Sequence, residues 1–216
     1  MADIAFLLLI FFLVTTTMSV EMGILRILPP YDPIAEPAIV PERNVLRVLV
    51  NDSGELIVED ELMVLDDLRG VVQEFMTNPS DRPDLPQMRV VSMGSIKMVG
   101  NFELDRELQD RLRTIELIGP YRELPPNAVI SLQTGSQTSY DMYVQVQNEL
   151  ESAIRELRDQ LSKKKFGRSY SELDEKSEED RDLIKAIHMV YPQRVSEAEP
   201  VEMDVKHGAF HSIDGR

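Results

Sequence analysis

The chain opens on a long uncharged stretch. From Ile4 to Val20 there is no charged residue, proline or glycine, and Asp3 stands immediately before this run. At a helical rise of about 1.5 Å per residue, the run covers about 25 Å of a hydrocarbon layer that is roughly 30 Å thick. We therefore predict a transmembrane helix over residues 1–22, embedded in the lipid bilayer, with Asp3 near one of its ends.

A cleaved signal peptide is the alternative interpretation of this stretch. Such a peptide has a basic start, a shorter apolar core and a small-residue cleavage site. Here the start is acidic, and the sequence TTTMSVEMG that ends the run has no such site. The pattern favours a retained helix, but its orientation stays open, because only the terminal amine and Arg26 flank it with positive charge.

Prolines follow the predicted helix at short intervals. Between residues 23 and 43 the chain contains Pro29, Pro30, Pro33, Pro37 and Pro41. Proline at this density excludes a helix and favours the extended polyproline II conformation, which acts as a semi-rigid spacer. We expect residues 23–43 to form a linker that tethers a folded domain to the membrane.

Short apolar runs then predict a β-hairpin at the start of the folded domain. Residues 45–50 and 56–58 have the apolar character of strands, and NDSG between them is typical of a turn. Oxygen-bearing side chains at residues 51–55 resemble calcium ligands by type only, because the twelve-residue spacing of a calcium loop is absent.

Apolar positions three and four residues apart predict the helices. One runs from Leu62 to Phe75, and a long one opens with a capping box of Thr138 and Asp141 and ends at Gly167. A strand over residues 128–133 precedes the long helix. The sequence thus predicts a small α+β domain over residues 44–165, with helices packed on a mixed β-sheet.

Two further segments, an insertion and a C-terminal extension, add to the predicted α+β domain. An insertion around residues 79–120 contains a strand candidate, MRVVSMGSIKMV, and a charged helix candidate, ELDRELQDRLRTIELI. Residues 166–216 form an acidic C-terminal extension, in which Ser177 and Asp180 predict the start of a short helix. From QRVSEAEPVEMD onward the extension is expected to be extended or disordered.

Composition and charge exclude several functions. The net charge is −15, with 23 basic against 38 acidic residues, so a nucleic-acid partner is not expected. The chain has no cysteine, and its three histidines, His188, His207 and His211, all lie in the extension without a catalytic or metal-binding motif around them. We therefore expect neither an enzyme nor a cofactor or metal site.

Several segments resemble the ExbD/TolR family of biopolymer transport proteins. DIAFLLLIFFLVTTTM followed by ILPP is similar to the family's aspartate-led membrane helix and its Leu-Pro exit. The segments VLRVLVNDSGELIVEDE and AVISLQTGSQTSYDMYVQVQNELESAIRELRD also resemble the family, and YPQRVSEAEP is similar to the tail of a longer ExbD subgroup. Residues 79–120 do not match the family pattern. The family's basic segment before the aspartate is absent, so we expect Met1 to be an internal methionine.

The resemblance implies a single-pass protein of the cell inner membrane with its C-terminal domain in the periplasm. It implies an ExbB-like ring of membrane helices and a TonB-like protein as partners, and a homodimer. Asp3 matches the family's proton-carrying carboxylate, which alternates between a charged and a neutral form. Thr15, Thr16 and Thr17 are expected to serve helix packing.

Three functions remain open at this point. The resemblance favours an ExbD-like subunit that uses the proton-motive force to energise TonB-dependent import across the outer membrane. A TolR-like or other stator subunit, serving envelope integrity or motility, would share Asp3 and the fold. A membrane-anchored adaptor without a proton role is the third, in which Asp3 only stabilises the helix N-terminus.

Overall fold

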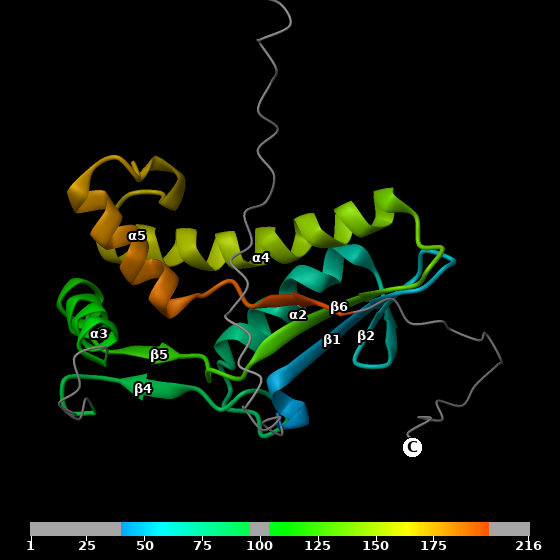
Figure 1. Cartoon of the computed structure of the whole chain (residues 1–216), viewed down its shortest axis with the longest axis horizontal. Coiled ribbons are helices and arrows are strands. Elements are labelled where there is room, and N and C mark those ends of the chain that lie inside the picture. Colours follow the sequence, from blue (N-terminus) through cyan, green and yellow to red (C-terminus); the bar gives the residue numbers. More distant parts are fainter. Residues whose placement is uncertain (1–39, 96–103, 199–216) are drawn as a thin grey trace, which may run out of the picture. The chain divides into compact units, whose positions relative to one another are not determined.

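The computed structural model describes residues 40–95 and 104–198 (Figure 1). These residues belong to the second of the two units into which the chain divides, Ile39–Arg216. The predicted membrane helix, with Asp3, Thr15, Thr16 and Thr17, lies outside the described residues, as does most of the proline-rich linker. In the part that is described, no helix combines the length and apolarity that a membrane span requires.

A five-stranded mixed sheet forms the centre of the domain. Its strand order is β3-β2-β1-β6-β7, built from β1 (Val45–Val50), β2 (Leu56–Val58), β3 (Glu61–Met63), β6 (Val129–Thr134) and β7 (Val195–Glu197). The first three strands are antiparallel neighbours, while β6 is parallel to both β1 and β7. A short 3-10 helix, η1 (Glu42–Asn44), leads into β1.

The predicted hairpin of β1 and β2 is confirmed, and its turn explains residues 51–55. The side-chain oxygen of Asn51 accepts hydrogen bonds from the backbone N–H groups of Ser53 and Glu55, at 3.0 and 2.8 Å. Gly54 takes the left-handed conformation, with φ of 78°, that favours glycine. These polar side chains therefore close a turn.

Two helices cover one face of the sheet, so the predicted α+β architecture is confirmed (Figure 1). Helices α2 (Leu65–Thr77) and α4 (Tyr140–Phe166) contact each other and share one hydrophobic core with the sheet. The predicted stripe of α4 supplies Val146, Leu150, Ile154 and Leu157 to that core. As predicted, Gly167 ends α4 in a left-handed conformation.

Two details of the predicted helices are wrong. Leu62 belongs to β3 and is 71% exposed, because the chain turns at Glu59 and Asp60 and forms a third strand before α2 begins at Leu65. Helix α4 is capped by Ser139, whose hydroxyl oxygen accepts a hydrogen bond from the Met142 N–H at 3.3 Å. The predicted cap, Thr138, instead donates its hydroxyl proton to backbone oxygens of β1 and the adjoining turn.

The insertion and the C-terminal extension build a second hydrophobic cluster together. The strands β4 (Arg89–Val91) and β5 (Tyr121–Glu123) pair antiparallel, and α3 (Leu104–Ile118) packs against α5 (Glu178–Val190). Their shared core consists of Val91, Ile115, Ile118, Tyr121, Ala186 and Val190. We call these four elements the second module. Each contributing segment has too few apolar side chains to bury a core alone.

The extension contains a short 3-10 helix, η2 (Tyr170–Glu172), before α5, and it continues into the sheet after α5. Helix α5 begins after Ser177 as predicted, but the Ser177 side chain makes no capping bond, so the proposed capping box is wrong. Asp180 instead accepts hydrogen bonds from the Asp174 N–H, at 3.0 Å, and from Arg168, at 2.5 Å. Beyond α5 the predicted extended segment forms the edge strand β7.

Candidate functional site

A pocket of about 760 Å³ opens beside the first half of β1. It lies between η1, the start of β1, the β2–β3 turn, the C-terminal half of α2 and the loop over residues 78–87. Its apolar lining comes from Val40, Val45, Leu46, Val71, Phe75 and Leu85. Its charged lining comes from Glu42, Arg43, Arg47, Glu59, Glu61, Glu74, Arg82 and Asp84. The volume falls within the range of roughly 300–1,000 Å³ typical of ligand pockets.

The pocket exists because β1 is longer than its antiparallel neighbour. Residues 45–50 of β1 pair with β6 along their whole length, but pairing with β2 begins only at Val48. No strand pairs with the first three residues of β1 on that side. Their backbone groups form local bonds there instead: the Val45 N–H donates to the Glu42 carbonyl, and Arg47 is bonded to Glu59.

Glu59 occupies the edge of β1 at Arg47. Its carboxylate accepts a hydrogen bond from the Arg47 backbone N–H at 2.6 Å, and its own N–H donates to the Arg47 carbonyl at 3.1 Å. The Arg47 guanidinium pairs with Asp60 at 2.8 Å. A half-exposed carboxylate thus stands where a neighbouring strand would place a carbonyl group.

The two residues that place this carboxylate have an unfavourable backbone. Glu59 and Asp60 form the β2–β3 turn with φ of 49° and 69°, a left-handed conformation that glycine, asparagine and aspartate adopt most readily. The cost of roughly 1–2 kcal/mol that other side chains have in this region therefore applies to Glu59. The bonds to Arg47 offset part of that cost.

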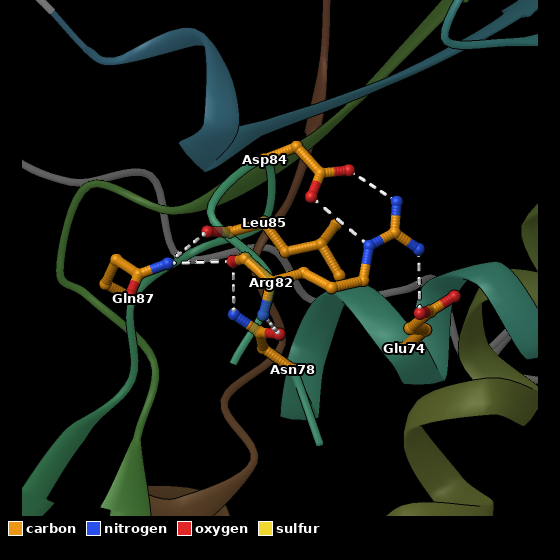
Figure 2. Close-up of polar contacts among 6 residues, drawn as sticks. All are labelled: Glu74, Asn78, Arg82, Asp84, Leu85 and Gln87. Atoms are coloured by element: carbon orange, nitrogen blue, oxygen red, sulfur yellow. Dashed lines mark hydrogen bonds and ion pairs between the residues drawn. The ribbon is translucent and has the colours of Figure 1, made fainter. Parts of the chain in front are cut away.

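The loop over residues 78–87 lines one side of the pocket. Figure 2 shows the polar contacts that hold this loop. Asn78 is fully buried, and its amide nitrogen donates to the carbonyls of Arg82 and Pro86, both at 3.0 Å. Its side-chain oxygen accepts from the Arg82 N–H at 2.8 Å. Gln87 adds a bond to the Arg82 carbonyl at 2.8 Å. The loop is therefore held in one shape without a ligand.

The pocket lining contains more acidic than basic side chains. Asp84 and Glu74 both bind the Arg82 guanidinium, the latter at 3.0 Å (Figure 2). They raise the pKa of Arg82 above its ordinary value, and Arg82 lowers the pKa of Asp84 in return. Five carboxylates against three guanidinium groups leave the lining with a net charge of −2.

The pocket combines an apolar floor with a charged rim, an arrangement typical of ligand-binding sites. Its lining contains no histidine, serine or threonine, and no group of metal-ligating side chains gathers in residues 40–95 and 104–198. The sequence contains one signal for this pocket, the segment NPSDRPDLP after α2. It does not indicate that this loop lies close to β1.

The structure describes only some of the residues that the sequence analysis singled out. Asp3 and the threonines 15–17 lie outside the described residues, as do His207 and His211. The His188 ring nitrogen Nε2 lies 2.6 Å from the Tyr170 hydroxyl. Partial burial and the nearby Arg158 lower the pKa of His188 to about 4, which keeps its ring neutral at physiological pH.

Comparison with known families supports the resemblance over residues 1–158, a range that includes residues 79–120, while the tail segment YPQRVSEAEP lies outside it. The family model described as biopolymer transport protein ExbD/TolR matches residues 1–158, well over half of the chain. Proteins of this family are non-catalytic subunits of energy-transducing transport systems and generally work with ExbB- or TolQ-type and TonB- or TolA-type partners. No curated protein matches the chain. The chain belongs to the ExbD/TolR family of biopolymer transport proteins.

Proposed function

We propose that the chain is the proton-carrying subunit of an inner-membrane complex that uses the proton-motive force to energise import across the outer membrane. The observation that carries the proposal is Asp3, a single carboxylate at the head of an uncharged run, inside the part of the chain that the family model matches. Its partners would be an ExbB-like ring of membrane helices and a TonB-like protein.

The mechanism follows from the cost of a charge among apolar helices. A buried carboxylate that takes a proton from one side of the membrane becomes neutral, and it becomes charged again when the proton leaves to the other side. The two states favour different positions of the helix. Moving one charge across about 100 mV supplies about 2.3 kcal/mol, enough to bias a two-state element.

In this proposal the rest of the chain transmits the movement of the membrane helix to the periplasm. Residues 1–22 would span the inner membrane once, with Thr15, Thr16 and Thr17 packing against neighbouring helices. Residues 23–43 would tether the α+β domain of residues 44–165 and the extension of residues 166–216 in the periplasm. Two such chains would form a homodimer inside the ring.

The test is the substitution Asp3→Asn in the chromosomal gene of the host. Asparagine has nearly the same shape but cannot bind and release a proton, so energised uptake across the outer membrane should fall to the level of a deletion strain. Asp3→Glu, which keeps the titratable group, serves as the matched control. Membrane abundance and co-purification with the ring protein should be unchanged in both variants.

The outcomes separate the alternatives. Normal uptake together with normal detergent resistance of the Asp3→Asn strain, at a normal amount of protein, would refute the proton-carrying role. Normal uptake but increased sensitivity of that strain to detergents would instead assign the chain to an envelope-integrity system. Loss of uptake together with loss of assembly would contradict the proposal that Asp3 acts in proton transfer rather than in complex formation.

A further inference from the structure

We propose that the pocket beside β1 binds a small organic cation, a molecule with an apolar body and an ammonium or guanidinium group. The apolar body lies on the floor of the pocket, and the cationic group contacts the carboxylates of its rim. No added strand takes part, because the backbone of β1 is already bonded on this side. The inference concerns the folded domain and does not depend on a proton-carrying role of Asp3.

The floor of the pocket provides the first argument, since it leaves apolar surface open to water. Val45, Val71 and Leu85 line the pocket and are only half buried, and Val40 at its margin is 38% exposed. Val71 and Leu85 pack on the main hydrophobic core, which includes Phe75. Removing apolar surface from water is favourable, so a ligand with an apolar body gains free energy by covering this floor.

The carboxylates of the rim provide the second argument. Glu42 and Glu61 line the pocket, and both are exposed. Within the described residues, neither side chain takes part in an ion pair, and the same is true of Arg43, whose charge offsets that of Glu42. The lining as a whole keeps a net charge of −2. A concave surface that carries one sign of charge attracts the opposite charge, so the rim favours a cation.

The same lining disfavours an anion and a bare metal ion. The guanidinium groups of Arg47 and Arg82 each contact two carboxylates, which an anion would have to displace. An anion beside Arg43 would be repelled by the adjacent Glu42. A metal ion needs several converging ligands, and no such group gathers in the part of the chain that the structure describes. An organic cation is a ligand that uses both the floor and the rim.

The fixed loop provides the third argument. Because Asn78 holds residues 78–87 in place, the part of the wall that Asp84 and Leu85 contribute is present before a ligand arrives. A preformed site avoids the entropic cost of ordering a loop on binding. The pocket can therefore bind a small molecule without rearrangement of this wall.

The experiment titrates three small molecules into the isotope-labelled full chain in zwitterionic nanodiscs and follows the backbone amides by NMR. Phenethylamine has both an apolar body and an ammonium group. The molecule 3-phenylpropionate has the same body with a carboxylate, and ethanolamine has the ammonium group without the apolar body. Only phenethylamine should bind, with a dissociation constant of about 1 mM. Its amide shifts should cluster at residues 42–46, 59–61 and 82–85.

Two double variants test the contact with the rim. Glu42→Gln combined with Glu61→Gln removes both unpaired carboxylates and should weaken the binding of phenethylamine about fivefold. Glu178→Gln combined with Glu179→Gln removes the same charge at exposed positions of α5 and should leave the binding within about twofold of wild type. All four side chains are exposed, so both variants should fold.

Each other outcome overturns the inference. No binding of phenethylamine, or shifts confined to other elements, would refute the site. Equal binding of 3-phenylpropionate would refute the role of charge, and equal binding of ethanolamine would show that the apolar floor is not used. Unchanged binding by the rim variant would exclude Glu42 and Glu61 as contacts of the cation. Equal weakening by the two double variants would reduce the effect to attraction by the net charge of the chain.

Discussion

Asn78 should be the residue on which the pocket wall depends. It ends α2 in a left-handed conformation with φ of 36°, its side chain is fully buried, and it makes three hydrogen bonds to the loop that it begins. Substitution by glycine removes these bonds and keeps the backbone conformation, whereas substitution by alanine removes the bonds and also adds backbone strain. The two variants therefore separate the two contributions.

The loss in the free energy of unfolding depends on which backbone groups lose their only hydrogen bond. The Arg82 carbonyl keeps its bond from Gln87, but the Arg82 N–H and the Pro86 carbonyl are left without a partner among the described residues. An unsatisfied polar group in such a setting costs about 1–1.5 kcal/mol, so Asn78→Gly should lower the free energy of unfolding by about 2–3 kcal/mol. Asn78→Ala should cost about 1 kcal/mol more, because alanine disfavours the left-handed region.

The assay is urea unfolding of the detergent-solubilised full chain, followed by far-UV circular dichroism. Asn148→Ala, at an exposed position of α4, is the control and should change the free energy of unfolding by less than about 0.5 kcal/mol. A loss below about 0.5 kcal/mol for Asn78→Gly would refute the claim that this side chain holds the loop. A glycine variant less stable than the alanine variant would refute the strain argument.

Two further predictions concern titration in the C-terminal part of the domain. Hydrogen bonds from Lys163 and from the segment after α4 lower the pKa of Asp159 from 3.8 to about 2. Its stabilisation is therefore complete above about pH 4 and lost as the pH falls through about 2, so the stability difference between wild type and Asp159→Asn should vanish over that range. His188 should titrate near 4 in NMR, below the ordinary 6.5, and Arg158→Met should raise that pKa. Titration of His188 near 6.5 in the wild type would contradict its burial beside Arg158.

Local patterns predicted the elements whose partners are close in sequence. The hairpin of β1 and β2 follows from apolar runs on either side of NDSG, and the stripe of α4 follows from apolar side chains three and four residues apart. Both depend on the periodicity of the backbone, which the sequence displays directly. The α+β class could therefore be predicted without the structure.

The errors occurred where tertiary contacts decide between local alternatives. Leu62 fits a helical spacing with Leu65 and Leu68. The turn at Glu59 and Asp60 lacks the glycine or asparagine that usually indicates a tight hairpin turn in a sequence. Thr138 and Ser139 are both suitable caps by type. The hydroxyl of Thr138 is taken by the carbonyl of Val50, a contact across 88 residues that no local pattern contains.

The pocket could not be predicted for the same reason. Its opening beside β1 results from the different lengths of β1 and β2, and its wall depends on the side chain of one asparagine. The second module has a core drawn from residues 91–121 and 186–190, whose apolar positions show no sign in the sequence of belonging together. Such long-range complementarity appears only when the chain is folded.

The insertion and the pocket are physically connected, which suggests a reason for the second module. The wall of residues 78–87 leads directly into β4, and Arg122 on β5 donates a hydrogen bond to the Asn78 carbonyl at 3.4 Å and pairs with Asp81. The base of the wall is thus fixed from both sides, by Asn78 within the loop and by the second module behind it. Since α5 completes the core of that module, the C-terminal extension supports the wall indirectly. These contacts from β5 add to the bonds within the loop and oppose its movement, which is otherwise usual for exposed surface loops.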